Sequence, residues 1–109
     1  MLEPILGSKN AERVLMFILA RDQGYTREIA RFSGGDPDSV QKQLARLELG
    51  GVLVSKSEGR TRIYRFNPRY SFLKELKTLL EKALLFYPPD EQERLTVVRR
   101  RPRRKGKPL

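Results

Sequence analysis

Apolar side chains recur at the three- and four-residue spacing of an amphipathic helix in four stretches of the chain. These stretches cover residues 8–21, 27–33, 37–49 and 71–87. Ser8 and Asp36 can each cap a helix start, because their side-chain oxygens accept from free backbone amides. Pro37 suits the first helical position, where no amide hydrogen bond is lost. The pattern therefore predicts four helices, of which the second is short.

Two runs typical of β-strands lie between the third and fourth predicted helices. They span residues 52–56 and 61–66 and are separated by residues 57–60, which favours a two-stranded antiparallel hairpin. Alternation in the second run places Thr61, Ile63 and Arg65 on one face and Arg62, Tyr64 and Phe66 on the other. Neither face is purely apolar, so we expect a neighbouring helix to support this narrow ribbon.

The order of the predicted elements is that of a winged helix-turn-helix domain. The sequence thus predicts a mainly α fold with a small β-hairpin, made of a three-helix core, a two-stranded wing and a C-terminal helix. A chain of 109 residues leaves little room for a second core, so we expect one domain over residues 1–87 and a basic, flexible tail over 88–109. Within this tail, Asp90 can start a short helical turn that runs through Glu93 to Val98. In the third helix, Ala45 is expected to tuck beside the apolar stripe of Val40, Leu44 and Leu47.

The chain is strongly basic, with 23 Lys and Arg against 13 Asp and Glu and a formal net charge of +10. Seven basic residues follow Thr96 with no acid among them, so the rest of the chain carries 16 − 13 = +3. The seven are Arg99, Arg100, Arg101, Arg103, Arg104, Lys105 and Lys107. Such a balance favours a polyanionic partner. The tail can lie along DNA phosphates, and RNA or an acidic protein are alternative partners for it.

Cysteine and histidine are both absent from the sequence. Disulfides, thiolate metal sites and the commonest metal ligand and general base are therefore missing, so we expect neither metal nor cofactor. Catalysis is disfavoured because serines such as Ser39 and Ser55 have no histidine base. No apolar run approaches the roughly 20 residues of a membrane span, and the first residues do not resemble a signal peptide. We expect no membrane partner and a cytoplasmic location.

Three stretches, residues 25–30, 38–54 and 58–68, resemble the ArsR-like winged-helix transcriptional regulators. Ala30, the Gly34 turn, Val40 and a Gly-Arg wing tip occur together in the family's order, and the resemblance covers roughly residues 5–85. Metal-sensing members of this family bind metal through Cys, His and acidic residues. Because this chain lacks Cys and His, a metal inducer is not expected.

The resemblance implies a homodimer, because members of the family usually pair through their first and last helices. The apolar arc over residues 71–87 is wider than one small core requires, which agrees with this implication. The side chains expected at the dimer interface are Leu15, Phe72, Leu76, Leu79, Leu80, Ala83 and Tyr87.

The third helix is the candidate reader of DNA, because one α-helix fits the major groove and polar side chains there distinguish base pairs. The candidates on this helix are Ser39, Gln41, Lys42, Gln43 and Arg46. Glutamine can bond adenine at two atoms, and lysine can reach guanine O6 and N7. The alternative is that these are ordinary solvent-facing residues.

The predicted wing and the start of the second predicted helix carry further cations, at positions where a winged domain contacts the DNA backbone. The wing candidates are Lys56, Arg60, Thr61 and Arg62, whose alternative role is a solvated turn that opposes aggregation. Thr26 and Arg27 can hold phosphates at the start of the second helix, although Thr26 also fits a plain N-cap. The sequence thus predicts a sequence-specific, double-stranded-DNA-binding transcriptional regulator, acting as a homodimeric repressor. The alternative is an interaction module that binds a protein or RNA through its basic tail.

Overall fold

The computed structural model describes residues 1–96 and confirms the predicted winged helix fold. The elements are α1 (Glu3–Leu6), α2 (Lys9–Arg21), α3 (Thr26–Ser33), α4 (Pro37–Leu49), β1 (Leu53–Glu58), β2 (Thr61–Phe66) and α5 (Leu73–Leu84). Residues 89–96 form a further helix. The strands pair as one antiparallel hairpin in which Leu53 lies opposite Phe66 and Glu58 lies opposite Thr61.

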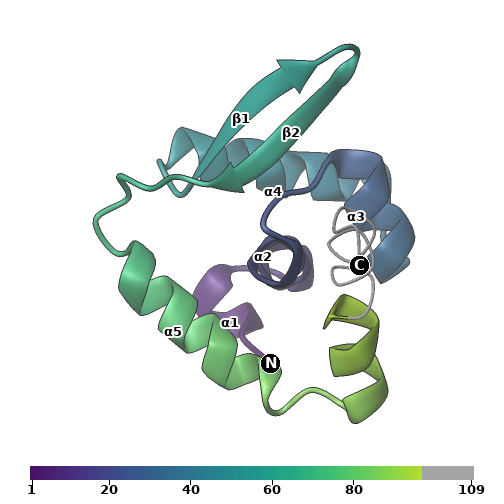
Figure 1. Ribbon diagram of the computed structural model, residues 1–109, viewed down its shortest axis with the longest axis vertical. Helices are drawn as coiled ribbons and strands as arrows, with labels where there is room; N and C mark the ends of the chain where they lie inside the picture. Colours follow the sequence, from purple (N-terminus) through teal and green to yellow (C-terminus); the bar gives the residue numbers. More distant parts are fainter. Residues whose placement is uncertain (97–109) are drawn as a thin grey trace, which may run out of the picture.

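Helix α2 occupies the centre of the molecule, with the hairpin and α4 on one side of it and α5 on the other (Figure 1). It packs against α1, α3, α4, α5 and β2. For this reason α2 is buried almost all round and not on one stripe only, with Val14, Phe17 and Ile18 each at most 1% exposed. The core thus forms around a single central helix, and the other elements enclose it.

The predicted helix starts at Ser8 and Asp36 are confirmed by their caps. The Ser8 hydroxyl accepts from the Ala11 amide at 3.0 Å, and the Asp36 carboxylate accepts from the Ser39 amide at 3.1 Å. Thr26 is not an N-cap, because it is the first residue of α3 and the cap position belongs to Tyr25. Helix α1 was not predicted, since four residues are too few to show a helical period.

The hairpin is longer and tighter than predicted, with only Gly59 and Arg60 between the paired strands. Gly59 has a φ of 65°, the left-handed conformation that such a two-residue turn requires. A third segment joins the ribbon, because Gly24 exchanges two backbone hydrogen bonds with Tyr64, at 3.0 and 2.8 Å. This bridge ties the wing to the turn between α2 and α3.

Gly24 is predicted to be intolerant of any side chain. A Cβ atom at this position would lie 2.8 Å from Cε1 of the Phe17 ring, which is itself locked in the core. We expect Gly24→Ala to lower the free energy of unfolding by about 1–3 kcal/mol, the usual range for overpacking a core. The measurement is urea unfolding with Gly50→Ala as control, because the nearest atom to a Cβ at Gly50 lies 3.5 Å away. Equal stability of the two variants would contradict the prediction.

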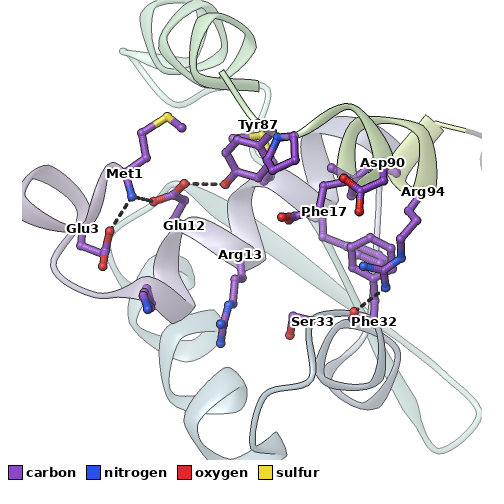
Figure 2. Close-up of a pocket in the computed structure, with 15 residues that line it drawn as sticks. Met1, Glu3, Glu12, Arg13, Phe17, Phe32, Ser33, Tyr87, Asp90 and Arg94 are labelled. Carbon is purple, nitrogen blue, oxygen red and sulfur yellow. Dashed lines mark hydrogen bonds and ion pairs between the residues drawn. The ribbon is translucent and has the colours of Figure 1, made fainter. Parts of the chain in front are cut away.

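Residues 89–96, which lie within the expected tail, form a helix that includes the helical turn expected from Asp90. Leu95 is only 2% exposed, and the Arg94 guanidinium lies 4.3 Å from the centre of the Phe32 ring while donating to the Phe32 carbonyl at 2.9 Å (Figure 2). Arg21 stacks on the same ring at 4.7 Å. These contacts dock the segment against α2 and α3. Residues 97–109, including the seven basic residues that follow Thr96, lie outside the described residues.

Part of the predicted dimer interface lies inside the subunit. Leu15, Leu80 and Ala83 are at most 4% exposed, because they pack in the core between α2 and α5. Tyr87 is half-buried and its hydroxyl donates to Glu12. Leu15, Leu80 and Ala83 are therefore not accessible to a second copy in this structure, whereas Tyr87 keeps part of its surface exposed. Phe72 is exposed, and Leu76 and Leu79 are half-buried against the core.

Candidate nucleic-acid interface

Helix α4 carries the face that points most directly away from the core. Val40, Leu44 and Leu47 are buried against the neighbouring elements α2, α3 and β1. At 3.6 residues per turn, four other residues of α4 lie on the side opposite this buried face and span about 60° around the helix axis. This outward stripe consists of Asp38, Lys42, Ala45 and Leu49, all of them exposed. Ala45 was expected beside the core and is instead part of this stripe.

Gln41, which was predicted to read bases, lies at the side of α4 and uses its side-chain amide in two hydrogen bonds within the chain. Its Oε1 accepts from the Thr26 hydroxyl of α3, and its Nε2 donates to the Tyr64 hydroxyl of β2 at 3.1 Å. The amide thus links both helices of the helix-turn-helix to the wing. To bond adenine at two atoms, Gln41 would first have to release these two partners. In this structure Gln41 therefore has a positioning role.

Three other predicted readers on α4 also have partners within the chain. Arg46 donates through Nε to Gln43 Oε1 at 3.0 Å and through Nη2 to the Leu6 carbonyl at 2.9 Å, which fastens α4 to α1. Ser39 donates from its hydroxyl to Asp36 at 3.1 Å and belongs to the cap of the helix. Lys42 differs from these, because it stands at the middle of the outward stripe and no hydrogen bond or ion pair within the described residues engages its ammonium group.

The wing has a fixed base and a charged tip. Arg62 donates to the hydroxyls of Ser55 and Ser57 at 2.9 and 3.0 Å, and Ser55 in turn donates to Glu48 of α4 at 2.6 Å. Ser55 thus links the ribbon to α4, and Arg62 bridges the two strands of the ribbon beside it. Arg60 is exposed in the two-residue turn at the tip.

Lys56 and Thr61 share the other face of the ribbon. In the pairing register Lys56 lies opposite Ile63 and Thr61 lies opposite Glu58. Lys56 is exposed, whereas Thr61 is half-buried. Of the predicted wing residues, Arg60 and Lys56 therefore present the most accessible charge.

Helix α3 carries two further exposed cations. Arg27 is exposed at the second position of the helix, and Arg31 is exposed one turn later on the same side. Arg31 was not among the predicted site residues, although its four-residue spacing from Arg27 is visible in the sequence. The Thr26 hydroxyl is used for Gln41. Its backbone amide belongs to the first turn of α3, where amides have no partner within the helix.

The interface region combines many accessible cations with a few acids. The exposed cations of α3, α4 and the hairpin are Arg27, Arg31, Lys42, Arg46, Lys56, Arg60, Arg62 and Arg65. Asp36, Asp38 and Glu58 are exposed acids of the same region. The excess of cations favours a polyanion, and their separation over two helices and a ribbon suits a long one such as a duplex.

A cleft of about 570 Å³ opens between α1, α2, α3 and the segment after α5 (Figure 2). Glu12, only 5% exposed, lies on its wall and accepts from the Leu2 amide at 2.7 Å and from the Tyr87 hydroxyl, with the N-terminal ammonium 3.2 Å away. Burial, the largest influence, raises the pKa of Glu12, but these donors together hold that pKa below its ordinary value. Burial and the bond to Glu12 raise the pKa of Tyr87. Glu12 is thus a charged anchor that joins the N-terminal residues to Tyr87, which follows α5.

Removal of the Glu12 charge is predicted to reduce stability in a pH-dependent way. Because its folded pKa is lowered, Glu12 contributes stability above its unfolded pKa and loses that contribution as pH falls through the folded pKa. We expect Glu12→Gln to cost about 1–3 kcal/mol near neutral pH, with the difference from the wild type shrinking in acid. Urea unfolding at a series of pH values measures this, with the exposed Glu58→Gln as control. A constant difference across the series would contradict the assigned charge.

Metal and membrane features are absent from the described part of the chain. Within residues 1–96 no group of three His, Cys, Asp or Glu side chains is placed to hold a metal ion. No helix among these residues is both long and apolar enough to cross a bilayer.

Comparison with solved structures places this fold among known winged helix proteins. A mutant of ZitR from Lactococcus lactis, in apo form, is 18% identical with a TM-score of 0.55, over 91% of this chain and 83% of that chain. The adhesin competence repressor AdcR from Streptococcus pyogenes is 12% identical with a TM-score of 0.53, over 84% of this chain and 77% of that chain. No protein-family model and no curated protein matches the sequence. These likenesses confirm the winged helix fold and are not specific to ArsR-like proteins.

Proposed function

We propose that the chain is a double-stranded-DNA-binding transcriptional regulator that enters the major groove with α4 and contacts the backbone with its wing. The observation that carries this proposal is the outward stripe of α4, which presents Lys42 opposite the core while Arg60 stands at the wing tip. The similar fold of a protein named as a repressor supports the same function. The proposed output is repression, by occupying DNA that polymerase needs, and no catalytic step is assigned to the chain.

The proposed DNA contacts divide into positioning and reading groups. Arg27, Lys56 and Arg60 are assigned to phosphates, together with the amides at the start of α3. Lys42 is assigned to base edges. Gln41, Gln43, Ser39, Arg46, Thr26 and Arg62 hold the helices and the wing in register, and Thr61 supports the turn of the wing.

The central test of the proposal is competition between duplex and single-stranded DNA. A labelled pool of random duplexes is bound by the chain and challenged with the same sequences as single strands. We expect the duplex to be preferred, and the double variant Lys56→Ala/Arg60→Ala, which removes two cations assigned to phosphates, to lose most of that binding. The matched control is Lys74→Ala/Lys82→Ala on α5, which removes the same charge from another element. Preference for the single strand would favour the alternative, an RNA-binding or protein-binding module.

A homodimer is proposed on the apolar residues that the subunit leaves uncovered. Phe72, Leu85 and Phe86 at the two ends of α5 are 63%, 73% and 68% exposed, and Leu76 and Leu79 on α5 are half-buried against the core. A second copy that covers them removes them from water at about 25 cal/mol per Å². A dimer also places two α4 helices on successive grooves, about 34–36 Å apart.

The dimer is predicted to dissociate when charge enters this surface. We expect Phe72→Asp/Phe86→Asp to sediment as a monomer at concentrations at which the wild type is a dimer, because burying an unpaired carboxylate opposes association. Analytical ultracentrifugation measures this, and Ile5→Asp on α1, also exposed, is the control that should stay dimeric. A monomeric wild type would contradict the proposed dimer without affecting the assignment of the DNA face.

A further inference from the structure

Two apolar side chains lie on the face of α4 that is proposed to enter DNA. Leu49 is 91% exposed, more than Phe72, Leu85 or the other exposed large apolar residues of the described chain. Ala45 is exposed one turn before it. Both belong to the outward stripe with Lys42, directly opposite the buried face of the helix. A leucine so fully in water on a helix of otherwise well-placed residues is unexplained by the packing of the subunit.

The two glutamines beside the stripe, Gln41 and Gln43, use side-chain atoms in hydrogen bonds within the chain. Both ends of the Gln41 amide are bonded to α3 and β2, and Gln43 Oε1 accepts from Arg46. The outward stripe of α4 therefore offers a groove one long cation and two apolar groups, with Asp38 at the start of the helix. Among the four bases, only thymine presents an apolar group in the major groove, its C5-methyl.

We propose that α4 selects DNA through thymine methyl groups, which pack against Ala45 and Leu49, while Lys42 reaches acceptors on a neighbouring base pair. The inference rests on the proposed function, because it requires α4 to lie in the major groove. It adds the class of sequence that the helix prefers, namely sites with thymines beside a guanine. The cations of the wing, at Arg60 and Lys56, keep the helix seated without any choice of sequence.

The test removes the methyl group and nothing else. Duplexes that the wild-type chain retains most tightly from a random pool are copied once with thymidine and once with deoxyuridine, which pairs identically but lacks the C5-methyl. We expect the uracil copies to bind more weakly by about fourfold for each contacted methyl, the equivalent of one buried methylene. In Ala45→Ser/Leu49→Ala the ratio between thymine and uracil copies should fall below about twofold, because the packing partners are gone.

The control is Ile5→Ala on α1, an exposed apolar residue assigned neither to DNA nor to the dimer, which should keep the wild-type ratio. A ratio near one for the wild type, with duplex binding intact, overturns the inference and leaves the proposed function standing. An unchanged ratio in Ala45→Ser/Leu49→Ala also overturns it, since the methyls would then be read elsewhere. Failure of the wild type to bind any duplex would overturn both.

Discussion

Lys42→Ala should lower affinity for a selected duplex by about 5- to 150-fold, which corresponds to about 1–3 kcal/mol for the loss of one well-placed base contact. Lys42 lies at the centre of the outward stripe of α4, where no other element of the described chain covers it. Because lysine there reads a base edge, affinity for random duplex should fall far less. Fluorescence anisotropy with the selected and the random duplex measures both losses.

Lys74→Ala on α5 is the control for this substitution, because it removes the same charge from a helix that is not assigned to DNA. It should leave the ratio between selected and random duplex unchanged. Equal losses on both duplexes in Lys42→Ala would make Lys42 a phosphate contact, and no loss on either would place the DNA face elsewhere.

Phe17→Ala should be the most destabilising of the substitutions considered, with an expected cost of about 3–5 kcal/mol. The Phe17 ring is 1% exposed, and its centre lies 5.5 Å from that of Phe32 and 4.5 Å from the Arg21 guanidinium. It also packs against Gly24, so its loss loosens the bridge to the wing. Since domains are stable by only about 5–15 kcal/mol, this variant should unfold at a much lower urea concentration.

The matched variant for this position is Phe17→Leu, which keeps an apolar side chain and leaves a smaller void. It should cost clearly less than Phe17→Ala in the same urea titration. Equal costs would indicate that ring stacking, and not filled volume, determines the stability of this part of the core.

The helices and hairpin were predictable because their signals are local. Ser8 and Asp36 cap helices wherever they precede an apolar period, and two β-rich runs around Gly59-Arg60 leave little choice but a hairpin. The sequence allowed a short helical turn from Asp90, but it did not show that the segment over residues 89–96 docks on the domain. Its docking depends on Arg94 stacking on Phe32, a contact across 62 positions of sequence that no local pattern reveals.

The sequence predicted which surface forms the candidate site, but it did not predict which of its residues bond to other parts of the chain. Composition and spacing identified the polar side chains of α4, yet could not show that Gln41 is bonded to Thr26 and Tyr64 or that Arg46 holds α1. The sequence placed Ala45 beside the core, whereas it is exposed, because a small apolar residue next to a buried stripe can be either buried or exposed. Each of these roles depends on which element comes to lie beside α4, and that is a tertiary property.

The dimer prediction shows the same limit. The sequence predicted a wide apolar arc over residues 71–87, but Leu80 and Ala83 within this arc pack against α2 of the same subunit. The large apolar residues that remain exposed along this part of the described chain lie at the ends of α5, at Phe72, Leu85 and Phe86. An apolar period alone does not say whether it covers its own core or a second copy.

The most direct test of the central claim, that α4 and the wing form the DNA face, is a map of backbone amide chemical shifts during titration with a selected duplex. The account predicts that the largest changes fall on α4 around Lys42, on the hairpin tip at Arg60 and on the first turn of α3. Changes confined to α5 or to the cleft around Glu12, with α4 and the hairpin unmoved, would contradict it.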